Sequence, residues 1–171
     1  DQSAFSLTPE GVLSFNSAPD FETKSSYSFT VTASESATQT GGVIAAPNNT
    51  EQIITVTIKN VNEVPTDIDL TLPNGSLYGS KLNMGSSWQG YVDENTIGTV
   101  IGTLSTTDLD SGDIHSYSLT GTNSELFDID SSHQLKLKDT VSLDYETQSS
   151  YTVTVTTTDS GSLSYSEYFV V

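Results

Sequence analysis

The chain has no cysteine and no arginine among its 171 residues, and it has only five lysines. Because cysteine is absent, neither disulfide bonds nor thiolate metal sites hold the fold together. Against the five lysines stand 22 acidic residues, which give a formal net charge of −17 at pH 7. A chain of this charge repels nucleic-acid phosphates and anionic lipid surfaces, so we expect neither nucleic-acid binding nor membrane insertion. It attracts hard cations instead.

Long hydrophobic runs and helical periodicity are also missing, so the sequence predicts no transmembrane helix and no signal peptide. Apolar residues instead alternate with threonine and serine, as in 27–31, 54–58 and 151–155. This alternation is typical of strands in a sheet that faces water on one side. Further strands are predicted at 99–104, 116–120, 134–138 and 165–171. Together with the Gly, Ser and Asn turns between them, they predict an all-β fold, an antiparallel Greek-key β-sandwich of the immunoglobulin-like kind.

Two stretches of the chain, residues 20–36 and 144–160, are similar to each other. Both read Asp-aromatic-Glu-Thr-x-Ser-Ser-Tyr and continue as a strand rich in Thr and Val. Upstream, three apolar residues of each copy also correspond: Phe5, Leu13 and Phe15 with Phe127, Leu135 and Leu137. A repeat of this length predicts tandem modules rather than one free-standing enzyme.

An extended linker at 60–66 separates the two copies, because Pro65 disfavours helix before it. We therefore predict a second, complete repeat at 66–171, with an insert at about 71–91. Residues 1–62 are predicted to be the C-terminal part of a first repeat, since they contain no counterpart of 92–120. Half a sandwich leaves an apolar face that other strands must cover.

The insert carries the aromatic residues Tyr78, Trp88 and Tyr91, and Trp88 is the only tryptophan of the chain. Two interpretations stay open. Exposed aromatics of this kind stack on sugars and pack against peptide side chains, which would make the insert a ligand platform. Alternatively, the same side chains cover the apolar face that the half-repeat leaves open.

Acidic motifs recur at the predicted strand ends. They are VDEN at 92–95, DLDSGD at 108–113, DFE at 20–22, DYE at 144–146 and TTD at 157–159. Two acidic side chains placed two residues apart on an extended segment point the same way, so Asp108 and Asp110 can hold one cation between them. Calcium takes six to eight oxygen ligands from carboxylates, Asn side chains and backbone carbonyls.

With the linker NVNEVPT at 60–66, this ordered set of motifs resembles bacterial cadherin-like repeats, which occur in tandem in large secreted adhesins of the RTX type. Repeats of that family carry VDEN, DxDSGD, LDYE and VTVTD motifs and a linker similar to NVNEAPT. The resemblance covers residues 60–171 almost completely, and the first copy from Phe5 onward. It implies a cadherin-like sandwich, Ca²⁺ as the cofactor and neighbouring repeats of the same chain as partners.

The resemblance also implies which residues bind calcium. One site would form between the repeats, from Asp20, Glu22, Asn60, the carbonyl of Val61, Asn62, Glu63, Asp108, Asp110, Asp113 and Asp159. A second group, Glu94, Asp144 and Glu146, would form the lower half of a site for a following repeat. The first copy departs from the family pattern, since Glu35 stands where aspartate is expected.

The expected function is a calcium-dependent, non-catalytic module of a bacterial adhesin, in which calcium makes the junction between repeats rigid. Its expected place is extracellular, on the bacterial cell surface, in cell adhesion, biofilm formation or host attachment; the absence of cysteine fits this setting. The alternative is a ligand-recognition module of the adhesin. In that case a peptide or a glycan would bind in a calcium-dependent pocket near the insert, through Trp88, Tyr78 and Tyr91.

The sequence predicts no enzymatic activity. It contains no G-x-S-x-G nucleophile motif and no Cys/His cluster. The two histidines, His115 and His133, stand in contexts that resemble strands. A single histidine in such a position is more commonly a packing or surface residue than a catalytic base.

Overall fold

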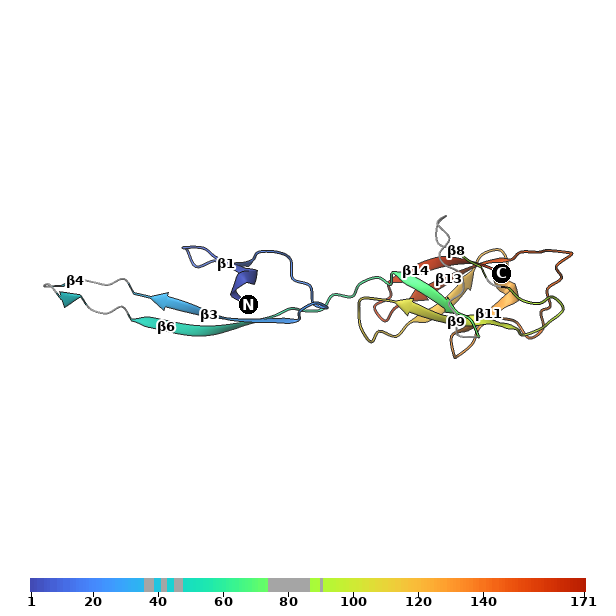
Figure 1. Cartoon of the computed structure of the whole chain (residues 1–171), viewed down its shortest axis with the longest axis horizontal. Helices are drawn as coiled ribbons and strands as arrows, with labels where there is room; N and C mark the ends of the chain where they lie inside the picture. The colour runs from blue at the N-terminus through green and yellow to red at the C-terminus, as the bar shows by residue number, and fades with distance from the viewer. Residues whose placement is uncertain (36–38, 41–42, 45–47, 74–86, 90) are drawn as a thin grey trace. The chain divides into compact units, whose positions relative to one another are not determined.

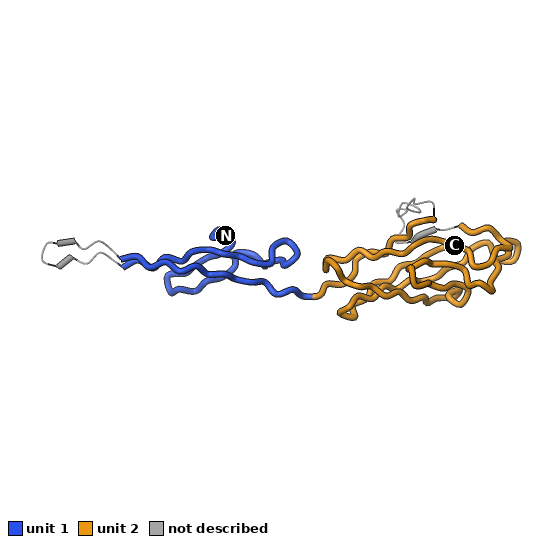
Figure 2. Tube along the Cα trace, turned by 90° about the horizontal axis from the view of Figure 1, so that it is seen from below, with its two compact units in different colours: residues 1–61 blue, residues 62–171 orange. Residues whose placement is uncertain are grey.

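The computed structural model describes residues 1–35, 39–40, 43–44, 48–73, 87–89 and 91–171 (Figure 1). The chain divides into two compact units, residues 1–61 and residues 62–171 (Figure 2). Regular structure in the described part consists of strands and two single-turn 3-10 helices, η1 (Gln2–Ala4) and η2 (Ser124–Leu126). The all-β prediction is therefore confirmed. None of the described helices has the length and apolar character needed to cross a membrane.

Two four-stranded sheets form the second unit. In spatial order, one sheet contains β10 (Ser116–Thr120), β13 (Thr152–Thr158), β14 (Ser164–Val170) and β8 (Ser87–Gln89). The other contains β11 (Phe127–Ile129), β12 (Gln134–Leu137), β9 (Val100–Thr107) and β7 (Asp67–Thr71). Neighbouring strands are antiparallel, apart from the parallel pair of β14 and β8. The chain passes between the two sheets several times, as a Greek-key sandwich requires.

The alternation of the sequence places the core between these sheets. In β13, Val153 and Val155 are 0% exposed, while Thr152 on the opposite face is exposed. The facing sheet contributes Leu135 and Leu137, which are also 0% exposed. Burying one Val or Leu side chain stabilises a fold by about 1.5–3 kcal/mol, so this core accounts for the stability of the unit.

A partly buried group of hydroxyls joins the two sheets near one end of the sandwich. Thr106 Oγ1 of β9 lies 2.8 Å from Thr157 Oγ1 of β13 and 2.8 Å from the Tyr117 hydroxyl of β10. Burial raises the pKa of Tyr117, which therefore remains a neutral hydrogen-bonding group. Hydroxyls that bond to one another in this way are tolerated inside a core. Because Thr106 and Thr157 lie near the ends of β9 and β13, their hydrogen bond holds together the strand ends that lead into Asp108 and Asp159.

The first unit consists of two-stranded pieces. Strand β1 (Phe5–Leu7) pairs with β2 (Leu13–Phe15), β3 (Ser26–Ser34) with β6 (Asn49–Thr57), and β4 (Gln39–Thr40) with β5 (Val43–Ile44). Aromatic rings hold the first two pairs together. The ring centroid of Phe5 lies 4.4 Å from that of Phe15 and 4.5 Å from that of Phe29.

The two units share one local design from η1 and η2 onward. The Ser28 N–H of β3 donates to Asp1 Oδ2 at 2.8 Å, and the Thr152 N–H of β13 donates to Asn123 Oδ1 at 2.9 Å. Each acceptor is the residue directly before a 3-10 helix. Asp1 therefore corresponds to Asn123, and within the described residues the first unit has counterparts of η2 and β11–β14 alone.

This difference leaves the apolar face of the first unit open in the part of the chain that the structure describes. Leu13 of the first unit is 37% exposed, whereas its counterpart Leu135 is 0% exposed. In the second unit, β7 and β9 supply Ile68, Leu70 and Leu104 to the same core. The first unit has no strands in those places among its described residues.

Much of the predicted insert lies outside the described residues. Strand β7 ends at Thr71 and β8 begins at Ser87, while residues 74–86 and 90 are not described. Tyr78 and the side chain of Trp88 fall in this part, although the backbone of Trp88 pairs with that of Phe169. Tyr91 is described, and its side chain is 69% exposed. Both interpretations of the insert therefore stay predictions.

The two histidines stand immediately before strands. His115 directly precedes β10, and His133 directly precedes β12 with a φ of 60°, in the left-handed region. The predicted strands at 116–120 and 134–138 begin at the same residues as β10 and β12. The position of His115 matters for the site described next.

Candidate metal centre

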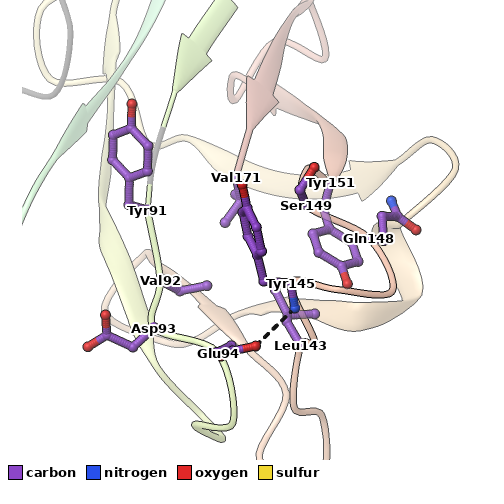
Figure 3. A pocket seen from close by; sticks show the side chains of 10 residues that line it. All are labelled: Tyr91, Val92, Asp93, Glu94, Leu143, Tyr145, Gln148, Ser149, Tyr151 and Val171. Carbon is purple, nitrogen blue, oxygen red and sulfur yellow. Dashed lines mark hydrogen bonds between the residues drawn. The ribbon is translucent and has the colours of Figure 1, made fainter.

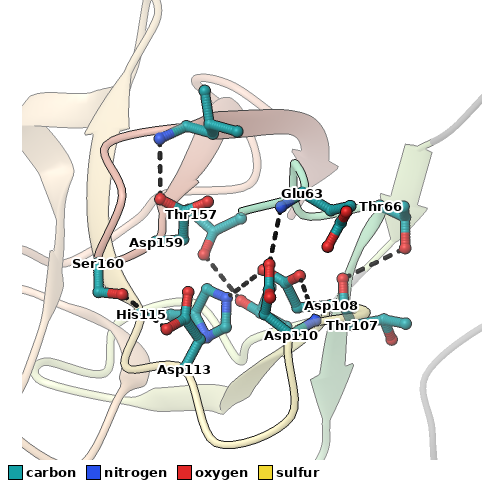
Figure 4. A network of polar contacts seen from close by, with 12 residues as sticks. Glu63, Thr66, Thr107, Asp108, Asp110, Asp113, His115, Thr157, Asp159 and Ser160 are labelled. Carbon is teal, nitrogen blue, oxygen red and sulfur yellow. Dashed lines mark hydrogen bonds and ion pairs between the residues drawn. The ribbon is translucent and has the colours of Figure 1, made fainter. Parts of the chain in front are cut away.

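Six of the predicted calcium ligands meet at one end of the second unit, and Figure 4 labels all of them except Asn62. We call them the proximal cluster: Asn62, Glu63, Asp108, Asp110, Asp113 and Asp159. Asp108 follows the last residue of β9, and Asp159 follows the last residue of β13. Because the hydroxyl network joins these strand ends, both aspartates lie at the same end of the sandwich.

Three carboxylates of this cluster lie unusually close together. One oxygen from each of Asp108, Asp113 and Asp159 lies within 4.8 Å of the other two. The Asp108 side chain is 3% exposed, and Asp159 is 6% exposed. Like charges at this separation, largely removed from water, repel each other strongly. A bound cation would convert that repulsion into ligation.

The DLDSGD loop folds so that its acidic side chains turn inward. Asp108 Oδ1 accepts the N–H of Asp110 at 3.1 Å, and the N–H of Asp113 donates to the Asp110 carbonyl at 3.3 Å. Gly112 has a φ of +93°, a conformation that glycine adopts readily and other residues rarely do. Across the gap to the β13–β14 turn, the Ser160 hydroxyl donates to Asp113 Oδ1 at 2.6 Å.

The first residues of the second unit lie against the DLDSGD loop and the β13–β14 turn. The Glu63 N–H donates to Asp110 Oδ2 at 2.7 Å, and Asn62 Nδ2 donates to Asp159 Oδ2 at 2.9 Å. Asn62 packs directly over Gly161, where an added Cβ would lie 2.4 Å from Asn62 Cγ. The absence of a side chain at Gly161 thus makes room for the linker, which lies against the aspartates.

The proximal cluster fits a hard divalent cation. The residues that the resemblance names as ligands offer only oxygen atoms, from carboxylates, an amide and the backbone, which is the set that calcium prefers. Asp113 Oδ2 exposes less than 1 Å² and has no hydrogen-bond partner among the described residues. A buried carboxylate oxygen without a donor is costly, and coordination to a cation would satisfy it.

One residue of this site was missed by the sequence analysis. His115 Nε2 lies 2.9 Å from Asp108 Oδ2, and the histidine side chain is only 13% exposed. His115 lies outside every acidic motif. The one available signal was its place two residues after Asp113.

A second acidic group, the distal cluster, lies at the opposite end of β13. One oxygen from each of Glu94, Asp144 and Glu146 lies within 4.8 Å of the others, and all three residues are exposed. Glu94 Oε2 accepts the N–H of Tyr145 at 3.2 Å, which ties the VDEN segment to the DYE turn. The sequence separates these residues by about fifty positions, and the fold brings them together.

The DYE turn and the DFE turn of the first unit are built alike. The Thr147 hydroxyl donates to Asp144 Oδ2 at 2.8 Å, and the Thr23 hydroxyl donates to Asp20 Oδ2 at 2.8 Å. These hydrogen bonds lower the pKa of both aspartates, because they stabilise the ionised form. Each turn therefore presents a carboxylate that is charged at neutral pH.

The remaining predicted ligands, Glu22, Asn60 and Val61, belong with Asp20 to the first unit. Glu22 is exposed, and Asn60 and Val61 follow β6 as extended chain. Their participation in one site with the proximal cluster stays a prediction.

A cavity of about 430 Å³ opens beside the distal cluster (Figure 3). It is lined by Tyr91, Val92, Asp93, Glu94, Leu143, Tyr145, Gln148, Ser149, Tyr151 and Val171. Tyr145 and Tyr91 are 66% and 69% exposed at its rim, while Tyr151 is 9% exposed. Aromatic walls with carboxylates at one side suit a ligand that has both apolar and polar parts.

Comparisons with known proteins agree with the fold of the second unit. Residues 89–171 match the cadherin domain. No curated protein matches the chain. The cadherin-like second unit thus has the fold that the motifs predicted, a cadherin-like β-sandwich.

Solved structures of cadherin repeats are similar to the chain. Repeats EC1–3 of protocadherin gamma C5 give a TM-score of 0.69 at 21% identity, over 98% of this chain and 50% of that one. Repeats EC22–24 of mouse cadherin-23 give 0.69 at 22% identity, over 100% and 50%. Repeats EC3–6 of protocadherin gammaB7 give 0.61 at 28% identity, over 100% and 37%. The chain spans half or less of the length of these solved chains.

Proposed function

We propose that this protein is a calcium-binding, non-catalytic adhesion module whose calcium site lies at the proximal cluster. The observation that carries the proposal is the approach of Asp108, Asp113 and Asp159 to within 4.8 Å of one another in a largely buried setting. The cadherin-domain match over residues 89–171 supports it independently.

Each part of the proximal cluster has its own role in this proposal. Asp108, Asp110 and Asp113 hold the ion from the DLDSGD loop, and Asp159 holds it from the end of β13. Asn62 and Glu63 add oxygen atoms from the linker, and Asp20, Glu22, Asn60 and the Val61 carbonyl add theirs from the first unit. A bound calcium ion would supply the positive charge that these carboxylates lack. Joining both units through one ligand set would make the junction rigid.

We further propose that the module belongs to a large bacterial adhesin of the RTX type and works outside the cell, on the cell surface. The ordered motifs VDEN, DLDSGD, LDYE and NVNEVPT support this assignment, and the absence of cysteine fits it. The distal cluster would then be the half-site for a following repeat. Cell adhesion, host attachment or biofilm formation are the functions that such a stalk serves.

Calcium should raise the melting temperature of the protein. A ligand at a hundredfold excess over its Kd stabilises the native state by about 2.7 kcal/mol, which corresponds to roughly 10 °C for a domain of this size. The measurement is differential scanning calorimetry of the chelated protein against added Ca²⁺, with Mg²⁺ as the control, because Mg²⁺ demands a stricter six-oxygen geometry. An unchanged melting temperature at millimolar Ca²⁺ would contradict the proposal.

The cavity beside the distal cluster supports a second function, ligand recognition. Its exposed aromatic side chains and neighbouring carboxylates suit a peptide that has both apolar and charged parts. We expect peptide arrays to retain the protein, and Tyr145→Ala to reduce that retention at least tenfold. Tyr168→Ala is the matched control, since Tyr168 is 58% exposed and does not line the cavity. Retention by glycan arrays alone, or an equal loss from both variants, would refute the peptide assignment.

A further inference from the structure

We infer that His115 is a positioning residue for calcium binding, which holds the carboxylate of Asp108 in the orientation that the ion requires. The inference rests on the proposed function of the proximal cluster and goes beyond it. His115 is not one of the residues that the motif resemblance names as ligands. Its assignment comes from its contact with Asp108 and its place in the strand register.

The geometry restrains Asp108 from two sides. The His115 Nε2 lies 2.9 Å from Asp108 Oδ2, and the Asp110 N–H donates to Asp108 Oδ1 at 3.1 Å. A carboxylate oxygen has two lone-pair sites. Each oxygen of Asp108 therefore keeps one site for a cation after accepting its hydrogen bond. With both oxygens engaged, the carboxylate cannot turn about its own axis without losing a contact.

Burial makes this contact stronger than a surface hydrogen bond. The side chains of His115 and Asp108 are 13% and 3% exposed. The imidazole donates its Nε2–H to the carboxylate, and the low local dielectric increases the strength of that bond. Hydrogen bonds to metal-ligating groups orient those ligands, and their removal typically lowers metal affinity about 10–100-fold.

The strand register explains why residue 115 reaches the cluster. Ser116, the first residue of β10, pairs with Thr158, the last residue of β13. Antiparallel register continued by one position places His115 opposite Asp159. The backbone that carries the imidazole therefore runs beside one predicted ligand, while the ring contacts another (Figure 4).

The test compares two replacements of His115. His115→Leu introduces an apolar side chain of similar bulk that cannot donate a hydrogen bond to Asp108. His115→Gln instead supplies an amide N–H that can donate one. Isothermal titration calorimetry of the full chain with Ca²⁺, at fixed pH and ionic strength, measures the calcium affinity of each variant. His133→Asn is the control, since it removes the other histidine and asparagine tolerates the positive φ there.

We expect His115→Leu to weaken calcium binding at the proximal cluster about 10–100-fold. We expect His115→Gln to recover most of that loss and His133→Asn to have no effect. The melting temperatures of the chelated variants show whether the fold is intact. Equal affinities of His115→Leu and the unchanged protein would overturn the inference, as would an equal loss in His115→Gln with intact folding. A protein that binds no calcium at all would instead overturn the proposed function.

Discussion

Asp110→Ala should remove most of the stabilisation that calcium provides. Asp110 is 9% exposed, its Oδ2 accepts the Glu63 N–H at 2.7 Å, and one of its oxygens lies within 4.8 Å of the Glu63 carboxylate. It is therefore the aspartate that links the DLDSGD loop to the linker. If its loss weakens binding a hundredfold, a calcium concentration that contributed about 2.7 kcal/mol would contribute only about 0.4 kcal/mol.

The measurement is the difference between the melting temperatures with calcium and with EDTA, because this difference cancels the loss of the Glu63 hydrogen bond in the calcium-free protein. Asp128→Ala is the control, since Asp128 is exposed on β11 and its replacement removes the same charge as Asp110→Ala. We expect its calcium-dependent shift to equal that of the unchanged protein. Equal reductions in both variants would mean that general acidity, and not a site, responds to calcium.

The choice of control illustrates what the structure adds to the sequence. Asp130 also lies outside the acidic motifs, and by sequence alone it is an equally suitable control. Its Oδ1, however, accepts the N–H groups of Ser132 and Gln134 at 2.8 and 3.0 Å and so closes the turn before β12. Its replacement would destabilise that turn without any involvement of calcium.

The fold was predictable because its strands face water on one side. Val153 and Val155 alternate with threonines that point outward, and this period of two marks β13 without any further information. The boundaries were less predictable. Strand β9 continues to Thr107, three residues beyond the predicted end at 104, because Ser105 and Thr107 pair with β7 through their backbones. Backbone pairing leaves no trace in the apolar pattern.

The acidic groups were predictable from motif order, but their internal contacts were not. Glu94 and Asp144 are fifty residues apart, and only the resemblance to known repeats linked them in advance. The contact of His115 with Asp108 had no motif to indicate it, since it depends on where β10 begins relative to β13. Residues that orient a ligand set are found through register and burial, whereas the ligands themselves are found through spacing.

Equivalent leucines in the two units should respond very differently to the same replacement. Leu135→Ala removes a side chain that is 0% exposed and packed between two sheets, and such a change typically costs about 2–5 kcal/mol. Leu13 holds the corresponding place in the first unit, but 37% of it is exposed because no counterparts of β7 and β9 cover it among the described residues. We expect Leu13→Ala to cost less than half as much.

Urea denaturation of both variants, followed by hydrogen exchange at the amides of β3 and β13, would report each unit separately. Exchange is needed because two units need not unfold in one transition. An equally large loss from Leu13→Ala would mean that in solution Leu13 is as fully packed as Leu135. The open face of the first unit would then be covered after all. A small loss would instead show that the first unit owes its stability to the aromatic contacts of Phe5 with Phe15 and Phe29 rather than to a closed sandwich.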